Sequence, residues 1–327
     1  MKDINILFLS AGRRVELIKS FKSAMEAAKI KGNIIAVDLQ EDAPALFFAD
    51  KMFKIRPIKE VGYIEDIIDI CNRESINLII PTIDTELEIL SKNKLYIEST
   101  TNAKVMVSDE KVIKIIRDKF KTYEFLKENG FKTPKVIKEE DIKNKNYSFP
   151  LFIKPLNGSS SINNFKINNE KELEFFKEYV PDPIIQEYAA GQEYCVDIFT
   201  DFNGKAITIV PKLRAAARTG EISKGKIVKD KKIIDLMKRL IDVLKPSGEI
   251  NVDCIVSDDC IYIIEINGRF AGGAPMSFKA GANSPLNLLR LLMGEDLDYN
   301  EDYEDNFVVL RYDDAISINS KGNLKYN

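Results

Sequence analysis

The 327-residue chain contains no histidine and only four cysteines. Without histidine, Ser-His-Asp catalysis, Cys-His catalysis and histidine-ligated metal sites are all excluded. The cysteines show no C-x-x-C spacing and are few for this length, which favours free thiols packed as small apolar side chains. The chemistry that remains is that of carboxylates, lysine, arginine and a bound metal.

Long apolar runs and a strong net charge are also lacking. No run approaches the roughly 20 apolar residues that span a bilayer, and the first residues, MKDINILFLSAGRR, lack the cleavage region of a signal peptide. With 48 basic and 51 acidic residues, the net charge of -3 gives no overall basic field for nucleic acid. We therefore expect a cytoplasmic, globular protein of one to three domains that binds neither membrane nor nucleic acid.

The first hundred residues alternate between short apolar runs and helical patterns. A run at 5–9 ends at Ser10-Ala11-Gly12 and precedes a helical pattern over 15–25; further runs at 34–37 and 78–80 enclose a helical stretch at 64–71. This alternation predicts a parallel sheet with crossovers, a Rossmann-like domain that ends near Val107. The glycine turn can hold phosphate, but it is not G-x-G-x-x-G, and a structural turn is the favoured interpretation.

Asp84 and Glu86 follow the strand predicted at 78–80. Open α/β sheets bind ligands at the carboxyl ends of their strands, so both carboxylates can be ligand contacts. They can equally cap the helix that follows, and the sequence does not decide between the two.

A β-hairpin is predicted where two β-branched runs, 250–256 and 260–266, flank Asp258-Asp259. Because side chains alternate along a strand, Asn251 and Asp253 share one face, as do Glu265 and Asn267 on the returning strand. Carboxylate and amide oxygens suit Mg²⁺, which usually binds together with substrate phosphates. A solvated acidic hairpin is the alternative, but solvation explains poorly why acidic residues lie between isoleucines.

Two further features belong to this hairpin. Arg269 follows it closely and supplies a planar fork suited to phosphate or carboxylate. Cys254 and Cys260 can face each other across it, although no disulfide is expected in the cytosol.

The hairpin resembles the metal-binding end of the ATP-grasp superfamily, in the branch similar to the carbamoyl phosphate synthetase large subunit. Its NVD and EINGR correspond to that family's N-x-[QD] and E-x-N-x-R. The resemblance implies that Asp253 and Glu265 hold one Mg²⁺ and that Glu265 and Asn267 hold a second, with Mn²⁺ as a possible substitute. It also implies that Arg269 contacts the transferred phosphoryl group.

Upstream pieces resemble the phosphate end of the same family. An Asp-Lys pair at 118–119 implies that Lys119 binds nucleotide phosphates. The strand FPLFIK ends at Lys154 and precedes PLNGSSSIN, and a cation beside a small-residue loop is suited to an anion. The resemblance implies that Lys154 and the loop residues bind phosphate, the loop residues being Gly158, Ser159, Ser160 and Ser161.

The next pieces resemble the nucleoside end. In IIQEYAAGQEY, the similarity implies that adenine binds at Gln186, Glu187, Tyr188 and Ala189 and that Glu193 holds the ribose hydroxyls. Past a hairpin turn at Asn203-Gly204, KLRAAARTGEISKGK supplies Arg214 and Arg218 as candidate substrate or phosphate contacts. A solvated helix face is the other interpretation of this segment.

Other elements follow from local signals. Ser108 is expected to cap a helix, Gly130 to end the helix around Leu126, and 229–244 to form an amphipathic helix with Met237 in the core. A helix at 286–293 and a strand at 307–310 complete the prediction.

The predicted fold is α/β, with α+β in its second part. A Rossmann-like pre-ATP-grasp domain at 1–107 precedes a two-subdomain ATP-grasp fold at 108–327, with a lid at about 120–190 and a metal-binding subdomain at about 191–327. SAGRRVEL, DKMFKI and PTIDTELEIL are the pieces similar to the pre-ATP-grasp domain, which in that family helps build the acceptor site.

The resemblance implies an ATP- and Mg²⁺-dependent ligase for small molecules, with a homodimer as a possible assembly. The enzyme would activate a carboxylate as an acyl phosphate, join it to an amine or thiol, and release ADP. The alternatives are a carbamoyl phosphate synthetase-like phosphorylating subunit and a non-catalytic ATP-binding regulator.

Overall fold

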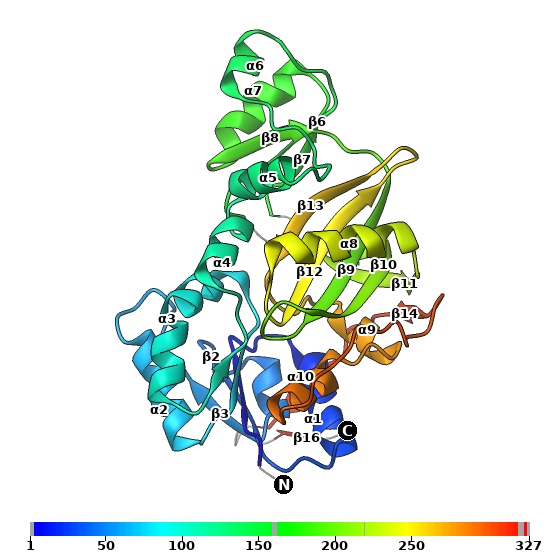
Figure 1. Ribbon diagram of the computed structural model, residues 1–327. Coiled ribbons are helices and arrows are strands. Elements are labelled where there is room, and N and C mark those ends of the chain that lie inside the picture. Colours follow the sequence, from blue (N-terminus) through cyan, green and yellow to red (C-terminus); the bar gives the residue numbers. More distant parts are fainter. Residues whose placement is uncertain (1–2, 159–161, 219, 320–323, 326–327) are drawn as a thin grey trace.

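The computed structural model describes residues 3–158, 162–218, 220–319 and 324–325. Its main sheets are a five-stranded parallel sheet near the N-terminus, a six-stranded antiparallel sheet and a three-stranded antiparallel sheet, stacked from bottom to top in Figure 1. This arrangement confirms the predicted fold class.

Helices cover both faces of the parallel sheet, whose strand order is β3-β2-β1-β4-β5. Its strands are β1 (Ile6–Leu9), β2 (Ile34–Asp38), β3 (Lys51–Lys54), β4 (Leu78–Pro81) and β5 (Lys104–Val105). Because side chains alternate, Phe8 packs in one core with Phe21 of α1 (Val15–Ala27), and Leu7 packs in the other core with Ile67 of α2 (Tyr63–Arg73). The Rossmann-like prediction is confirmed. Edge strand β3 was not predicted, because none of its side chains is fully buried.

The three-stranded sheet, β7-β6-β8, has a core of its own. Its strands are β6 (Leu151–Pro155), β7 (Phe165–Ile167) and β8 (Pro183–Glu187), and its helices are α6 (Glu139–Lys143) and α7 (Glu170–Tyr179). Leu151, Ile153 and Leu173 form a cluster separate from the other cores.

Between the first sheet and this small sheet the chain forms α3 (Leu87–Thr100), α4 (Glu110–Ile116) and α5 (Lys119–Glu128). Asp118 Oδ1 caps α5 by accepting hydrogen bonds from the amides of Phe120 and Lys121. The cap predicted at Ser108 is wrong: α4 begins after Asp109, and the Ser108 hydroxyl accepts from the amide of Ser247 at 2.9 Å.

The six-stranded sheet has the order β13-β12-β9-β10-β11-β14. Its strands are β9 (Gln192–Thr200), β10 (Ala206–Arg218), β11 (Glu221–Ile227), β12 (Glu249–Val256), β13 (Ile261–Asn267) and β14 (Val308–Leu310). The amphipathic helix α8 (Lys231–Leu244) packs on it through Met237, Leu240 and Ile241, as predicted. The basic segment after Pro211 forms the strands β10 and β11, so its interpretation as a helix face is wrong.

The predicted metal hairpin forms with the expected faces. Asn251 pairs with Asn267 and Asp253 with Glu265, so all four side chains lie on one side of β12 and β13. Cys254 lies opposite Ile263, because a bulge after Asp253 shifts the register, so it does not face Cys260. All four cysteines are free.

After the hairpin the chain returns to the first sheet. It forms α9 (Ala274–Lys279) and α10 (Ser284–Leu292), and Leu288 of α10 packs in the core that contains Phe21 of α1. The short strands β15 (Ser317–Ile318) and β16 (Leu324–Lys325) pair with each other. Within the described ranges, none of the helices has the length and apolar character needed to cross a membrane.

Candidate active site

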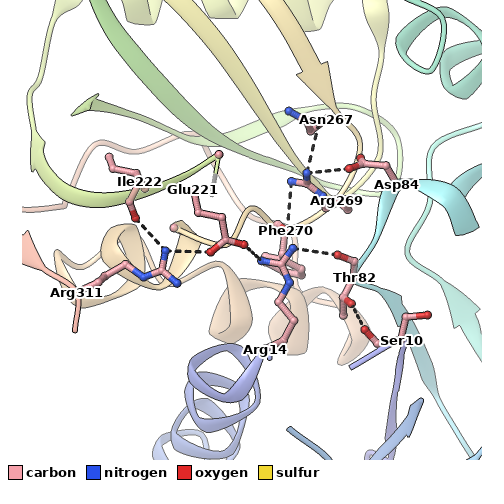
Figure 2. A network of polar contacts seen from close by, with 12 residues as sticks. Ser10, Arg14, Thr82, Asp84, Glu221, Ile222, Asn267, Arg269, Phe270 and Arg311 are labelled. Atoms are coloured by element: carbon pink, nitrogen blue, oxygen red, sulfur yellow. Dashed lines mark hydrogen bonds and ion pairs between the residues drawn. The ribbon is translucent and has the colours of Figure 1, made fainter. Parts of the chain in front are cut away.

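The carboxyl edge of the parallel sheet meets the end of the metal hairpin. Asp84, just after β4, accepts a hydrogen bond of 2.9 Å from Arg269, just after β13, although the two are 185 positions apart (Figure 2). Both side chains are largely buried, at 7% and 13% exposure. The predicted acceptor and phosphoryl regions are therefore in direct contact.

The candidate metal donors lie beside this pair. Asp253 Oδ1 is buried without a hydrogen-bond partner, and burial raises the pKa of Asp253 above its usual range. Asn267 Oδ1 lies 3.4 Å from Arg269 Nη2. Among the described residues no three Asp, Glu, Cys or His side chains are grouped so as to hold a metal ion, so a site here would need the Asn267 amide besides Asp253 and Glu265. This hard-oxygen set, with one unpaired buried carboxylate oxygen, fits Mg²⁺.

Two lysines from different elements approach Glu265. Lys119, at the start of α5, has its Nζ 3.8 Å from Glu265 Oε1 and donates to the Gly158 carbonyl at 2.6 Å. Lys154, on β6, is 3% exposed, and its ammonium group has no hydrogen bond or ion pair among the described residues. Burial lowers the pKa of Lys154 to about 8, and the negative charge of Glu265 opposes this shift. Both cations are thus positioned for an anion next to the metal donors.

The loop after Lys154 is only partly described. Gly158 is tied to Lys119, whereas Ser159, Ser160 and Ser161 lie outside the described residues. Their predicted contact with phosphate therefore stays a prediction.

The predicted adenine hinge leaves the end of β8. Gln186 is buried, and its Nε2 donates to the Pro134 carbonyl at 3.2 Å, so the amide is fixed in orientation. Glu187 and Tyr188 are exposed, with Lys166 Nζ 4.3 Å from the Tyr188 ring centroid, and Ala189 is half-buried. Here the chain crosses from the small sheet to β9 of the six-stranded sheet.

Glu193 lies just beyond this crossing. Its Oε2 is 3.3 Å from Arg214 Nη1, and both residues line a hollow of about 500 Å³ formed by 191–193 and 213–217. Arg218 is exposed and pairs with Asp313 near the C-terminal end. The structure therefore brings Arg214, but not Arg218, to the predicted nucleoside end.

A network that the sequence did not reveal surrounds the junction of the two sheets. Arg14 Nη2 donates to the Thr82 carbonyl at 3.2 Å, and its Nη1 lies 3.4 Å from Glu221 Oε1. Glu221 Oε2 is also 3.1 Å from Arg311, and Figure 2 shows this chain of contacts lying below Arg269. Burial, followed by the positive charge of Arg269, lowers the pKa of Arg14 to about 10. The Arg13-Arg14 pair after the glycine turn was the only sequence signal for this network.

Asp84 and Glu86 do not cap the helix that follows, so that alternative is wrong. The carboxylate of Glu86 is buried and accepts from the Tyr63 hydroxyl at 2.7 Å and from Ser10. Burial raises the pKa of Glu86 to about 7.

A second unpredicted feature is a fully buried ion pair between side chains of the neighbouring strands β9 and β10. Lys212 and Asp197 are 0% and 3% exposed, and Lys212 also donates to the Gly273 carbonyl at 3.2 Å. Asn251 and Ser277 donate to Asp197, so the inward side chain of Asn251 is already engaged. The Lys212 ammonium group is therefore enclosed by partners within the fold.

The matches to known families agree with this geometry. Residues 6–109 match the family described as "PylC-like, N-terminal domain", and residues 116–273 match "ATP-grasp domain". A D-alanine–D-alanine ligase of Francisella tularensis subsp. novicida (strain U112) is 30% identical over 151 residues, 42% of this chain and 49% of that relative. The chain thus spans about half the length of the curated relatives it matches.

Solved structures share the fold at low identity. N5-carboxyaminoimidazole synthetase from Staphylococcus aureus, complexed with ADP, superposes with a TM-score of 0.71 at 18% identity, over 91% of this chain and 80% of that one. The biotin carboxylase domain of Hydrogenobacter thermophilus 2-oxoglutarate carboxylase gives 0.72 at 16% identity, over 92% and 72%. Fold and matches define an ATP-grasp architecture preceded by a PylC-like domain. Residues 116–273 are therefore an ATP-grasp domain, which confirms the resemblance seen in the sequence.

Proposed function

We propose that this protein is an ATP- and Mg²⁺-dependent ligase that activates a carboxylate as an acyl phosphate and transfers the acyl group to an amine or thiol. ADP and phosphate are the other products. The observation that carries the proposal is the convergence of Lys119 and Lys154 on Glu265, beside Arg269. Phosphoryl transfer depends mainly on positioning and on neutralising charge, for which these groups suffice without a histidine or a protein nucleophile.

The nucleotide would lie between the small sheet and the six-stranded sheet. Adenine contacts the chain at 186–189, and the Glu193 carboxylate accepts from the ribose hydroxyls, with Arg214 holding that carboxylate at 3.3 Å. Lys119 and Lys154 bind the phosphates together with the backbone at Gly158. The hollow of about 500 Å³ beside Glu193 supports this placement, since small-molecule sites commonly enclose about 300 to 1,000 Å³.

Mg²⁺ would be held by Asp253, Glu265 and Asn267, and we propose two ions, with Mn²⁺ as a possible substitute. When bound, the metal neutralises charge on the phosphate oxygens. The protein's own groups act around it. Arg269 contacts the transferred phosphoryl group while Asp84 fixes the guanidinium in place through their 2.9 Å hydrogen bond. Arg218 is not assigned a place around the phosphoryl group, because in the structure it is exposed and pairs with Asp313.

We also propose the division into a pre-ATP-grasp domain at 1–107, a lid at about 120–190 and a metal-binding part at about 191–327. The separate core of the three-stranded sheet supports a distinct lid. A cytoplasmic homodimer acting on small molecules completes the proposal, and light scattering would test its assembly.

The test is a screen of purified protein for ADP release with pools of amino acids and other small carboxylates, in ATP and Mg²⁺. Glu265→Gln should abolish turnover without loss of fold, because this half-exposed side chain at a strand end contributes little to the core. Its matched control is Glu178→Gln on the exposed surface of α7. Full turnover by a folded Glu265→Gln variant would contradict the metal and phosphate assignment.

A further inference from the structure

The loop that carries Arg269 lies between two regular elements. β13 ends at Asn267 and α9 begins at Ala274, so residues 268–273, here called the arginine loop, connect the metal hairpin to a helix. The sequence of the loop is Gly-Arg-Phe-Ala-Gly-Gly, and glycine leaves a backbone more conformations than any other residue. The position of Arg269 relative to the metal donors therefore depends on what holds the two ends of this loop.

The first end of the loop is tied to a buried carboxylate on strand β9. Asn251 of β12 is the strand partner of Asn267, the last residue before the loop. The Asn251 Nδ2 donates to Asp197 Oδ1 at 3.0 Å. The side chain of Asp197 is only 3% exposed, so water does not compete for this hydrogen bond. The carboxylate thus fixes the strand position from which the arginine loop leaves.

The second end of the loop is tied to the same carboxylate by two routes. Ser277 of α9 donates to Asp197 Oδ2 at 2.6 Å, which connects the helix directly to the carboxylate. Lys212 of β10 pairs with Asp197 and donates at 3.2 Å to the carbonyl of Gly273, the last residue of the loop. Both ends of the arginine loop therefore meet at one buried ion pair between β9 and β10.

Close packing limits the path of the loop between these ends. A Cβ at residue 273 would lie 2.3 Å from Ile222 Cγ2, so the absence of a side chain at Gly273 lets the loop pass directly against β11. In the middle of the loop, Phe270 is 0% exposed and packs in the core that it shares with α1. Arg269 projects from this confined stretch beside the candidate metal donor Asn267 (Figure 2).

Stability alone does not account for a charged pair at this place. Taking two charges out of water costs free energy that their attraction often only just offsets, and apolar side chains of similar volume would fill the space as well. Apolar contacts have no preferred direction, whereas hydrogen bonds fix both the distance and the direction between donor and acceptor. The Asp197–Lys212 pair therefore supplies directional ties to a loop whose own glycine-rich backbone is not stiff.

We propose that Asp197 and Lys212 are positioning residues for phosphoryl transfer, which hold both ends of the arginine loop and thereby fix Arg269 beside the metal donors. The inference rests on the proposed ligase function and adds two residues that the proposed nucleotide and metal sites do not include. Phosphoryl transfer depends on positioning, and a displacement of about 1 Å can lower a rate about 100-fold. Loosening the loop should therefore slow turnover and leave ATP binding, which uses other residues, nearly unchanged.

The test removes both charges together. Changing one partner alone would leave the other buried and unpaired, so the pair variant combines Asp197→Asn with Lys212→Met, which keeps the net charge and nearly keeps the side-chain volumes. It loses the donor to the last carbonyl of the arginine loop. Ser277→Ala is a milder second variant that loses the tie to α9. Its matched control is Ser91→Ala, because Ser91 is also buried but donates to the Glu88 carbonyl within α3.

Hydrogen exchange followed by mass spectrometry examines the loop without any substrate. In the pair variant we expect the amides of 268–277 to exchange faster than in the wild type by on the order of 10-fold, while those of α8 at 231–244 keep their rate. The unchanged rate in α8 also shows that the variant is folded. Ser277→Ala should accelerate exchange over 268–277 by a smaller factor, and Ser91→Ala should not accelerate it.

Turnover is measured as ADP release with an acid that the wild type accepts. The pair variant should lower kcat by on the order of 10- to 100-fold while the calorimetric affinity for MgATP stays nearly unchanged, a separation that general destabilisation would not give. Because the pair acts through Arg269, the losses should not multiply. In an Arg269→Met background, the pair variant should lower kcat by less than about threefold further.

Two results would overturn the inference. One is an unchanged exchange rate over 268–277 in the folded pair variant and in Ser277→Ala; the other is a loss of kcat that multiplies fully when the pair variant is combined with Arg269→Met. If the pair variant does not fold, Ser277→Ala is held to the same two measurements. If wild-type protein releases no ADP with any acid, the ligase proposal fails, whereas hydrogen exchange still decides whether the pair holds the arginine loop.

Discussion

Lys154 and Glu193 mark opposite ends of the proposed nucleotide site and would recognise different parts of ATP. Lys154→Ala and Glu193→Ala should each weaken ATP binding by about 1.5 to 3 kcal/mol, the usual contribution of one charge-assisted hydrogen bond. The loss for Glu193→Ala should lie at the lower end of this range, because the Glu193 side chain is exposed to solvent. Calorimetry with ATP and 2′,3′-dideoxy-ATP distinguishes the two residues. Glu193→Ala should lose the preference for ATP, and Lys154→Ala should keep it. An undiminished preference in Glu193→Ala would reject its ribose role.

Glu86 gives the stability of the protein a dependence on pH. Burial raises the pKa of Glu86 from its ordinary value of 4.5 to about 7 in the folded protein. Because the folded state keeps this proton to higher pH than the unfolded state, the contribution of Glu86 is full below pH 4.5 and declines as pH rises to about 7. The total loss is at most about 3 kcal/mol.

The variant Glu86→Gln cannot ionise at this position, so it should not lose this contribution as the pH rises. Between pH 4.5 and pH 7.5 the free energy of unfolding of the wild type should fall relative to that of the variant by up to about 3 kcal/mol. Urea unfolding at both pH values measures the difference. Glu60→Gln, at an exposed position, should show no such change. A difference between Glu86→Gln and wild type that is the same at both pH values would contradict the buried-acid account.

At the scale of single elements, α5 connects helix capping to nucleotide binding. Asp118 caps the helix through the amides of Phe120 and Lys121, and Lys119 is the first residue of the helix. Asp118→Ala should cost about 1 kcal/mol of unfolding free energy and also weaken ATP binding, because the first turn would fray around Lys119. Asp118→Asn keeps a capping oxygen and is the matched control. Equal ATP affinity in Asp118→Ala and wild type would show that the cap does not position Lys119.

Elements with a strong periodic pattern could be predicted from the sequence. In residues 231–244 the apolar side chains recur with the period of a helix, so only one helix face can be buried. The metal hairpin has β-branched runs on both sides of an acidic turn. Edge strand β3 and the basic part of β10, after Pro211, escaped prediction. Their side chains are exposed or held by partners distant in sequence, so no local alternation marks them.

At the scale of the whole molecule, the candidate site combines residues that no local pattern connects. The order of Lys119, Lys154, Glu193 and the hairpin made the ATP-grasp resemblance visible. By contrast, Arg14 meets Glu221 across 207 positions and Asp84 meets Arg269 across 185. Only the packing of the parallel sheet against the six-stranded sheet creates these contacts, so the sequence left the role of Asp84 open and did not single out Arg14.

The placement of the charged side chains also predicts which phosphate of ATP the carboxylate attacks. Lys119 and Arg269 contact the candidate metal donors Glu265 and Asn267, and Lys154 feels the charge of Glu265, whereas Glu193 pairs with Arg214. Charge stabilisation concentrated at the terminal phosphates favours an acyl phosphate and ADP. Attack at the α-phosphate would instead release pyrophosphate and form an acyl adenylate, from which AMP leaves when the acyl group is transferred.

The most direct test of acyl phosphate formation follows an oxygen atom of the activated carboxylate into the products. With the carboxylate labelled with ¹⁸O, ATP, Mg²⁺ and an accepted amine, mass spectrometry should find the label in inorganic phosphate and ADP as the nucleotide product. Label in AMP, or ATP that binds and is never cleaved with any acid, would contradict the account.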